Sequence, residues 1–301
     1  MRCLIIAFSV VMITAAHGAA IAAAQGRMMT DMLGRAVRIP ESPLRIVSLA
    51  PSITEIIFAL GQGHRLRGVT RFSDFPVAAQ ALPKVGSYVQ LDLERIVSLQ
   101  PDLCIAVKDG NPKAVVARLE SLGIPVFAVD PRNLNAVLET ITTLGGLLEA
   151  HDVADALVED LEKRIQVVVE RRDRLRRQPT VFFQIGLSPI VSVGTDTFIH
   201  ELIVLAGGVN LAAGSVPYPR FSQEEVVAMA PDLIIITSMA REGIFETIRS
   251  EWMRWRNMPA ALNDGIVLVD SDLFDRASPR LFDGLERLAE IIHHPNRQVK
   301  P

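Results

Sequence analysis

The sequence contains little cysteine, few aromatic residues and no long basic block. Two of its 301 residues are cysteine, and one of these, Cys3, precedes the first apolar run. The other, Cys104, lies in the apolar run LCIAV, which predicts a small buried side chain rather than a reactive thiol. A single remaining thiol excludes an internal disulfide, so we expect the chain to depend on its hydrophobic cores for stability.

The charge balance argues against a nucleic-acid partner. Charged residues make up 22% of the chain and the formal net charge is -3, without a basic block long enough to follow a phosphate backbone. The length of the chain and its 49% of hydrophobic residues allow two modest domains or one large domain with well-buried cores.

Catalytic and metal-binding motifs are also missing. The sequence has no GxSxG motif, no P-loop and no CxxC motif, and the stretch GQGHRL follows a predicted helix, whereas a dinucleotide fingerprint follows a strand. The histidines beyond the amino-terminal segment form no ligand set with a carboxylate at a strand end: His64, His151, His200, His293 and His294. We therefore expect neither an enzyme nor a tight metal site, and no tightly held cofactor.

The amino-terminal segment MRCLIIAFSVVMITAAHGAAIAAAQG predicts export. Arg2 supplies a short positive start, an apolar run extends through Ile13, and small residues lead to Ala24. This pattern is typical of a signal peptide, residues 1–24, that is cleaved near Ala24. The alternative is a membrane anchor, but the apolar run is too short to span a bilayer. The position of Cys3 before that run argues against a lipid-anchored form.

From Leu44 onward, short β-rich runs alternate with helical stretches. Ser52 is predicted to cap the first helix, with Glu55 at the capping-box spacing. Strands are expected at residues 45–50, 66–72, 102–107 and 124–130, and helices at residues 52–60, 93–99 and 112–123. Alternation of this kind predicts a parallel sheet covered on both faces.

Residues 151–178 differ in composition from the preceding residues, because they contain no glycine or proline and many charged residues. They predict one long helix, roughly 40 Å at about 1.5 Å per residue, that stops before Pro179. Beyond it, strands are expected at residues 180–185, 232–238 and 265–270, and helices at residues 197–208, 224–230, 248–258 and 278–294. The sequence thus predicts an α/β protein of two similar lobes with parallel sheets, residues 25–150 and 179–301, joined by one long rigid α-helix.

One stretch of the sequence occurs twice. ERIVSLQPDLCIA begins at Glu94 and EEVVAMAPDLIII begins at Glu224, and their proline and aspartate residues match in register. Each copy reads as a helix followed by a strand, with the proline and aspartate marking the tight turn between them. The repeat predicts that the two lobes are structurally related.

The only two tyrosines of the chain, Tyr88 and Tyr218, stand at the same position before each copy of the repeat. Both lie in expected loops, and ligands of open α/β sheets bind beyond the carboxyl ends of the strands. Two tyrosines on facing loops would hold a large, flat and partly apolar ligand. The alternative is that they are unrelated surface residues.

Glu94 and Glu224 also occupy equivalent positions. Asp92 and Ser222 are good N-caps, which places both glutamates at the second helical position. A carboxylate there is stabilised by the helix dipole, which is one sufficient explanation. The other explanation is a protein partner that presents matched cations to both lobes.

Five segments resemble, in order, those of one family: RIVSLAP, FSDFP, LERIVSLQPDL, VPYP and SDLFDRASPR. They are similar to the cobalamin-binding branch of the periplasmic substrate-binding proteins of ABC importers, in the helical-backbone class that also binds haem and iron–siderophores. The resemblance covers about Leu44 to Ile292, and FSDFP, VPYP and FDRASPR are more specific to the cobalamin branch. It implies a periplasmic protein, expected to be a monomer, that captures cobalamin between its lobes and delivers it to the membrane permease.

The resemblance also implies roles for individual residues. Those expected to contact the corrinoid or line its cleft are Pro51, Phe72, Tyr88, Tyr218, Asp272 and Arg276. The two tyrosines stand where the family often has tryptophan. Asp272 and Arg276 would hydrogen-bond the side amides or the nucleotide loop of the ligand. Glu94 and Glu224 match the family's two docking glutamates, which meet arginines on the permease.

One position departs from the family pattern. Val191, in GLSPIVSVG, stands where the family has an aromatic residue. The resemblance then implies one ring contact fewer, and a different affinity or preferred corrinoid.

Two other functions are alternatives to a corrinoid receptor. A haem or ferric-siderophore receptor of the same class would use Tyr88 or Tyr218 as an iron ligand. A metallocluster protein of the same fold is disfavoured, because clusters commonly need several thiolates and the chain offers one.

Several residues also have plain structural explanations. Asp272 and Arg276 are four residues apart and would form a local ion pair of little value if exposed. Phe72 would also fit a core. Trp252 and Trp255 are expected to pack within the second lobe rather than contact a ligand.

Overall fold

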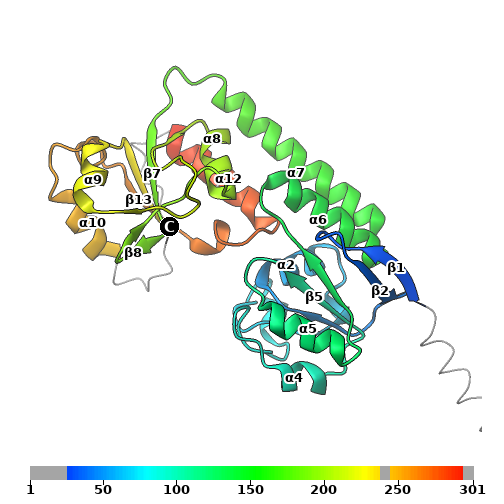
Figure 1. Cartoon of the computed structure of the whole chain (residues 1–301). Helices are drawn as coiled ribbons and strands as arrows, with labels where there is room; N and C mark the ends of the chain where they lie inside the picture. The colour runs from blue at the N-terminus through cyan, green and yellow to red at the C-terminus, as the bar shows by residue number, and fades with distance from the viewer. Residues whose placement is uncertain (1–25, 238–244, 294–301) are drawn as a thin grey trace, which may run out of the picture. The chain divides into compact units, whose positions relative to one another are not determined.

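The computed structural model describes residues 26–237 and 245–293 (Figure 1). The expected signal peptide, residues 1–24, lies outside the described residues. Within the described ranges, no helix combines the length and the apolar character needed to cross a membrane.

Two compact units make up the chain. The first contains the described residues up to Asp130 together with Leu144–Ala150, and the second contains Pro131–Thr143 and the residues from His151 onward. The boundary between the units falls within helix α6 (Leu134–Leu147), which the sequence analysis did not predict.

The first unit is built on a parallel sheet of four strands. In spatial order they are β4 (Leu66–Gly68), β3 (Ile46–Ser48), β5 (Leu103–Val107) and β6 (Val126–Val129). The helices are α2 (Pro51–Ala59), η1 (Gly63–Arg65), α3 (Val77–Gln80), α4 (Leu93–Ser98) and α5 (Lys113–Ser121). An antiparallel hairpin that the sequence analysis missed, β1 (Gly26–Thr30) and β2 (Ala36–Pro40), precedes the sheet.

The second unit has a parallel sheet of the same size and a small antiparallel one. The parallel sheet is β10 (Val209–Asn210), β7 (Thr180–Gln184), β12 (Leu233–Thr237) and β13 (Ile266–Val269), and the small sheet is β11 (Arg220–Phe221), β9 (Ile190–Val191) and β8 (Gly186–Leu187). The helices are α7 (His151–Arg172), α8 (Phe198–Leu205), α9 (Gln223–Ala228), α10 (Phe245–Met253), α11 (Pro259–Leu262), η2 (Ser271–Leu273) and α12 (Arg280–His293).

Both parallel sheets have the same strand order. In each sheet, taken in chain order, the first strand pairs with the second on one side and with the third on the other, and the fourth strand pairs with the third. The predicted α/β class and the predicted relationship between the lobes are therefore confirmed. The strand order reverses between β3 and β5 and between β7 and β12, and ligands of such sheets commonly bind beyond the carboxyl ends of the strands at this point.

The repeated sequence forms the same helix–turn–strand unit in both sheets. Two residues after the end of each helix, α4 and α9 are followed by a residue of left-handed backbone conformation, Gln100 with φ of 48° and Ala230 with φ of 49°. Pro101 and Pro231 follow and prevent the helix from continuing. The proline and aspartate therefore mark the turn, as predicted from the sequence.

Each repeated aspartate ties its turn to the neighbouring strand. The carboxylate of Asp102 accepts hydrogen bonds from the N–H groups of Leu44 (2.8 Å) and Arg45 (3.0 Å), just before β3. The carboxylate of Asp232 accepts from the N–H (2.8 Å) and the hydroxyl (2.9 Å) of Thr180, the first residue of β7. The N–H of each aspartate donates in return to the carbonyl of Arg45 or Thr180. The repeat thus sets the third strand beside the first in both sheets.

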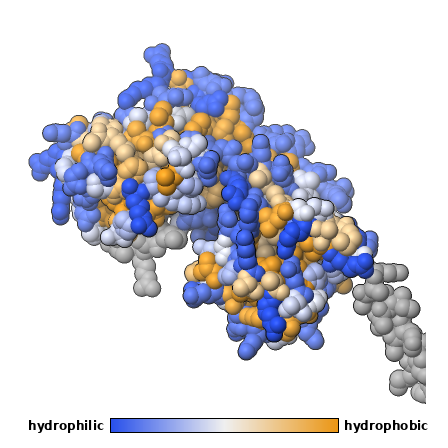
Figure 2. Space-filling model, in the orientation of Figure 1, coloured by the Kyte–Doolittle hydropathy of each residue, from blue (hydrophilic) through white to orange (hydrophobic). Residues whose placement is uncertain are grey.

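Each unit buries its own hydrophobic core. Cys104 is fully buried in β5, so its predicted burial is confirmed, and that burial, with the charge of Asp102, raises the pKa of its thiol to about 12. Trp252 is buried and its indole N–H donates to Gln184 at 3.0 Å, while Trp255 packs against the same core, as predicted. The surface visible in Figure 2 is mostly hydrophilic, with smaller hydrophobic areas.

The first helix begins earlier than predicted. α2 starts at Pro51 with Ala50 at the N-cap position, so the predicted capping role of Ser52 is wrong. Proline suits the first helical position because its ring fixes φ and the N–H that it lacks would have no partner within the helix. Pro51 therefore sets the start of the helix soon after the end of β3.

The long helix is shorter than predicted. α7 ends at Arg172, whereas the prediction extended to residue 178. After the helix ends, the chain turns and Leu175 packs over Gly207, where a β-carbon would lie 2.6 Å from its Cδ1. The glycine, which has a φ of 93°, leaves room for that contact.

α7 is held to α12 within the second unit. The guanidinium of Arg164 donates to Glu286 Oε1 at 2.8 Å and to Asp283 Oδ1 at 2.6 Å. The hydrogen bond between Arg164 and Glu286 is the main cause that raises the pKa of Arg164 and lowers the pKa of Glu286. The two helices also pack against each other.

We expect Asp232→Asn to destabilise the second unit by about 1.5–3 kcal/mol, the range for hydrogen bonds to a charged partner. Burial opposes ionisation of Asp232, but the hydrogen bonds from Thr180 and the charge of Arg177 outweigh it and lower the pKa below the ordinary 3.8. The stabilisation is therefore present above pH 3.8 and is lost as the pH falls through the lowered pKa of the folded state.

Urea unfolding of wild type and variant at neutral pH and in acid below pH 3.8 checks this, with Asp160→Asn on the exposed face of α7 as the control. Equal midpoints for wild type and Asp232→Asn at neutral pH would contradict the account.

Candidate ligand-binding and docking site

Three predicted residues lie beyond the carboxyl ends of strands in the first unit. Pro51 closely follows β3, and Phe72 and Tyr88 lie in the segments that connect β4 to α4. Both rings are exposed, 45% for Phe72 and 39% for Tyr88, so the alternative that Phe72 belongs to the core is wrong. The N–H of Arg71 donates to the carbonyl of Gly86 at 2.8 Å, which joins the two loops that carry the rings.

A buried cluster of hydroxyl groups fixes the start of the loop that carries Phe72. Thr54 Oγ1 lies 2.9 Å from Ser48 Oγ and 3.1 Å from Ser73 Oγ, and Ser73 Oγ lies 2.9 Å from Thr70 Oγ1. All four residues are buried. The cluster therefore connects the end of β3 and the first turn of α2 to this loop.

Lys84 holds the rest of the same loop. Its ammonium group donates to the carbonyls of Ser73 and Ala79, both at 2.9 Å. Burial lowers the pKa of Lys84, and the charge of Asp74 opposes that shift. A side chain that binds two carbonyls of one loop restricts the conformations the loop can adopt.

The Phe72 loop displays a second ring that the sequence analysis did not select. Phe75 is 46% exposed, close to the value for Phe72. The guanidinium carbon of Arg71 lies 4.8 Å from the centroid of the Phe72 ring, within the range of a cation–π contact. The signal for Phe75 was present in the segment FSDFP, in which both phenylalanines occur.

Tyr218 lies in the loop between β10 and β11 of the second unit, and 57% of it is exposed. The N–H of Gly194 donates to the carbonyl of Pro217 at 2.8 Å. A β-carbon at Gly194 would lie 2.0 Å from the carbonyl oxygen of Val216, so only glycine allows this close approach. The loop of Tyr218 is therefore held against the segment after β9.

Val191 is a half-buried strand residue. It lies in β9 and pairs with Arg220 of β11 on one side and Gly186 of β8 on the other. The position at which the resemblance implies an aromatic residue is thus part of the small antiparallel sheet.

Asp272 and Arg276 follow β13 and form an ion pair. Arg276 Nη2 lies 2.8 Å from Asp272 Oδ1, with 10% and 35% of the two side chains exposed. The local ion pair considered from the sequence is therefore present. A direct contact of either residue with a ligand stays a prediction.

Asp275 lies in the same segment and carries a perturbed carboxyl group. Desolvation and the charges of Asp272 and Asp270 raise its pKa to about 6, and the charge of Arg276 opposes the shift. Asp275 is exposed as a residue, so solvent limits the effect of desolvation and the repulsion from the two neighbouring carboxylates is the lasting cause of the raised pKa.

Glu94 and Glu224 occupy the predicted positions. Asp92 accepts a hydrogen bond from Arg95 N–H at 3.0 Å and is the N-cap of α4, which makes Glu94 the second helical residue. Ser222 is the N-cap of α9, within a capping box, and Glu224 is again the second helical residue. Both glutamates are exposed, which the helix-dipole explanation and the docking explanation alike require.

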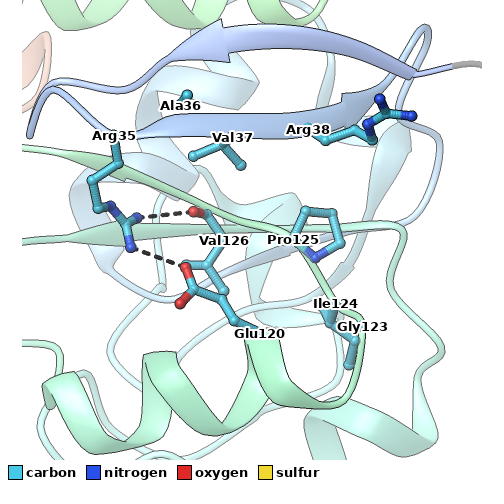
Figure 3. A pocket seen from close by; sticks show the side chains of 9 residues that line it. All are labelled: Arg35, Ala36, Val37, Arg38, Glu120, Gly123, Ile124, Pro125 and Val126. Carbon is cyan, nitrogen blue, oxygen red and sulfur yellow. Dashed lines mark hydrogen bonds and ion pairs between the residues drawn. The ribbon is translucent and has the colours of Figure 1, made fainter.

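A cavity of about 540 Å³ in the first unit lies away from these residues (Figure 3). It is lined by Arg35, Ala36, Val37, Arg38, Glu120, Gly123, Ile124, Pro125 and Val126. Arg35 donates to the carbonyl of Val126 at 3.0 Å and to Glu120 at 2.9 Å. This cavity contains none of the predicted ligand contacts, and its charged side chains are largely occupied with one another.

In the part of the chain that the structure describes, no three His, Cys, Asp or Glu side chains are grouped so as to hold a metal ion. What the two units do present is a pair of tyrosines on loops that precede the repeated helix. Two α/β units whose parallel sheets have the same strand order, each with a tyrosine on the loop before the repeated helix, are typical of one class, the two-lobed solute-binding proteins. The chain belongs to the periplasmic binding protein family, whose model matches residues 46–273.

Individual relatives are similar over most of the chain. The vitamin B12-binding protein of Yersinia pestis (strain Pestoides F) is 30% identical over 247 residues, which cover 82% of this chain and 85% of that protein. The structure of the periplasmic vitamin B12 binding protein BtuF of Vibrio cholerae is 29% identical, with a TM-score of 0.75, over 85% of this chain and 99% of that one. The periplasmic heme-binding protein RhuT from Roseiflexus sp. RS-1 is 28% identical, with a TM-score of 0.76, over 84% of this chain and 99% of that one.

We expect Asp275→Asn to stabilise the protein at neutral pH. A carboxyl group whose pKa is raised from 3.8 to about 6 by folding contributes stability below pH 3.8 that is lost as the pH rises through about 6. Asparagine removes the charge and keeps the shape, so the melting temperature of the variant should exceed that of wild type above that range.

Thermal unfolding across the same pH range tests this, with Asp155→Asn on the exposed surface of α7 as the matched control. If Asp275→Asn and wild type melt at the same temperature at every pH, the carboxylates of this segment do not repel one another as described.

Proposed function

We propose that this protein binds cobalamin in the periplasm and delivers it to the membrane permease of an ABC importer, without chemical turnover and as a monomer. The observation that carries the proposal is the 30% identity to a vitamin B12-binding protein over 82% of the chain, because a match of that length includes residues of both units. The structural similarity to the vitamin B12 binding protein of Vibrio cholerae supports it.

The exposed aromatic rings suit a corrinoid. A corrin is large and flat with apolar faces, and rings such as those of Phe72, Tyr88 and Tyr218 offer contact area at a low cost in side-chain entropy. The loops that carry them are held by hydrogen bonds in the free protein. Loops ordered in advance lose less freedom on binding, which favours affinity.

The polar edge of a corrinoid requires hydrogen-bonding partners. Asp272 and Arg276 supply an acceptor and a donor set, and their ion pair orients both side chains. Pro51, at the first turn of α2, offers an apolar surface without an N–H group that would need a partner. We assign these three residues to the amide side chains and the edge of the ligand.

Haem is the second candidate, because the heme-binding protein RhuT has a TM-score of 0.76 with this chain. In that case a phenolate oxygen of Tyr88 or Tyr218 would coordinate the iron, a role that tyrosine plays in other haem proteins. The two candidates differ in what they require of the tyrosines. A corrinoid needs the ring, and haem iron needs the hydroxyl group.

Tyr88→Ala and Tyr218→Ala are each expected to weaken cyanocobalamin binding by about 1–3 kcal/mol, the usual loss for an aromatic contact residue. Tyr88→Phe and Tyr218→Phe retain the ring and are expected to bind nearly as well as wild type. Isothermal titration calorimetry measures all four affinities. Loss of haemin binding in a phenylalanine variant, without cobalamin binding by wild type, would instead favour the haem candidate.

The two exposed glutamates are assigned to the permease. Glu94 and Glu224 stand at the same position of α4 and α9, so a permease with two related subunits would meet the same carboxylate in each unit. Opposite charges across a protein interface accelerate association, and salt weakens this effect. Helix-dipole stabilisation alone would give neither faster association with the permease nor a salt dependence of that association.

The double variant Glu94→Ala/Glu224→Ala is expected to bind cyanocobalamin with unchanged affinity and to lose retention on the purified permease complex, most visibly at low salt. The control is Glu139→Ala/Glu162→Ala, which removes two exposed helical glutamates elsewhere. Calorimetry and a pull-down at two salt concentrations provide the measurements. Undiminished retention of the Glu94/Glu224 variant would leave these glutamates as helix-stabilising residues only.

A further inference from the structure

The side chain of Asn111 joins three separate segments of the first unit. Its Oδ1 accepts a hydrogen bond from the N–H of Val107 at 2.8 Å. Its Nδ2 donates to the carbonyl of Leu49 at 2.9 Å and to the carbonyl of Tyr88 at 2.7 Å. Asn111 itself is buried, with 6% exposed.

These three partners meet at the point where the strand order of the sheet reverses. Leu49 directly follows β3, and Val107 is the last residue of β5, the neighbouring strand. Tyr88 belongs to the loop before α4. One amide group thus ties the carboxyl ends of the two central strands to a loop that displays an exposed ring.

A second contact acts on the ring of the same tyrosine. Gly110 has a φ of 129°, and a β-carbon there would lie 2.7 Å from Tyr88 Cδ2. The ring therefore lies against the backbone directly before Asn111. Within its own loop, Tyr88 is flanked by a local turn in which Ser87 N–H donates to the carbonyl of Gln90 at 2.9 Å. That turn shapes the loop, whereas Asn111 fixes the loop to the sheet.

We propose that Asn111 is a positioning residue for ligand binding, which holds Tyr88 in the orientation that contacts a flat ligand. This rests on the proposed function, in which Tyr88 contacts a corrinoid. Asn111 acts through Tyr88 and through no contact of its own with the ligand, because its amide is buried and both ends of it are occupied by backbone groups.

The chemistry requires an amide at this position. Asparagine offers an acceptor and two donors in one planar group, and the three bonds use both functions. Aspartate keeps the acceptor for Val107 but places an oxygen against the carbonyls of Leu49 and Tyr88. Alanine removes all three bonds. Both variants should therefore release the Tyr88 loop, for different reasons.

Asn111→Ala and Asn111→Asp are each expected to weaken cyanocobalamin binding about tenfold, the change that corresponds to loss of roughly one hydrogen bond's net contribution. Val126→Ala is the control, because it removes buried side-chain volume from β6 of the same core and leaves the three hydrogen bonds of Asn111 in place. The control should lower the melting temperature and leave the affinity unchanged.

A double-mutant cycle separates positioning from general stability. If Asn111 acts through Tyr88, the loss caused by Asn111→Ala should largely disappear in the Tyr88→Ala background. Full additivity of the two losses would overturn the proposal, as would wild-type affinity in both Asn111 variants.

Amide hydrogen exchange tests the same idea without any ligand. Asn111→Ala should speed exchange in residues 86–92 relative to wild type and to Val126→Ala, and unchanged exchange there would overturn the proposal. Failure of the Asn111 proposal and failure of the proposed cobalamin binding are therefore distinguishable. Faster exchange with no cobalamin binding by wild type would refute the proposed ligand but keep Asn111 as the anchor of the Tyr88 loop.

Discussion

The hydrogen bonds of Asp102 to the backbone before β3, and of Asp232 to Thr180 of β7, are the constraint on which each unit depends. Each carboxylate sets the start of the third strand beside the first. Because the strands are parallel, this also determines where their carboxyl ends lie. The loops that carry the candidate ligand contacts come after the strands of each sheet, so one short sequence used twice organises both units.

Buried polar contacts then restrict the loops that such a sheet leaves at its carboxyl edge. Lys84 binds two carbonyls of the loop that carries Phe72, and Asn111 binds the carbonyl of Tyr88. In the second unit, the close approach at Gly194 restricts the loop of Tyr218. A buried donor without a partner is costly, so these side chains favour one loop conformation. The exposed rings are consequently presented on ordered backbone, which suits the capture of a rigid ligand.

The sequence predicted the parts of this structure that leave periodic or repeated signals. The alternation of strands and helices, the burial of Cys104 and the caps at Asp92 and Ser222 all follow from local patterns. The start of α2 was misplaced because Ser52 is a good capping residue, yet Pro51 at the first helical position decided the boundary. The long helix was extended too far because the packing of Leu175 on Gly207 is a tertiary contact.

The candidate site was predictable only in part. The tyrosines and glutamates stand in register with the repeat, so counting residues along the chain was enough to find them. Asn111 gave no such signal, since an asparagine in a polar loop is common and its three partners come from distant segments. Phe75 was overlooked although its neighbour Phe72 was selected. Residues that act through tertiary hydrogen bonds can be recognised only in the structure.

The most direct test of the account is a competition titration of the wild-type protein, in which cyanocobalamin and haemin are offered together and the bound species is identified by its absorbance spectrum. The account predicts that cyanocobalamin binds with a dissociation constant of about 1 μM or tighter, roughly 8 kcal/mol of binding free energy, and that haemin does not displace it. Binding of haemin with no detectable binding of cyanocobalamin would contradict the central claim.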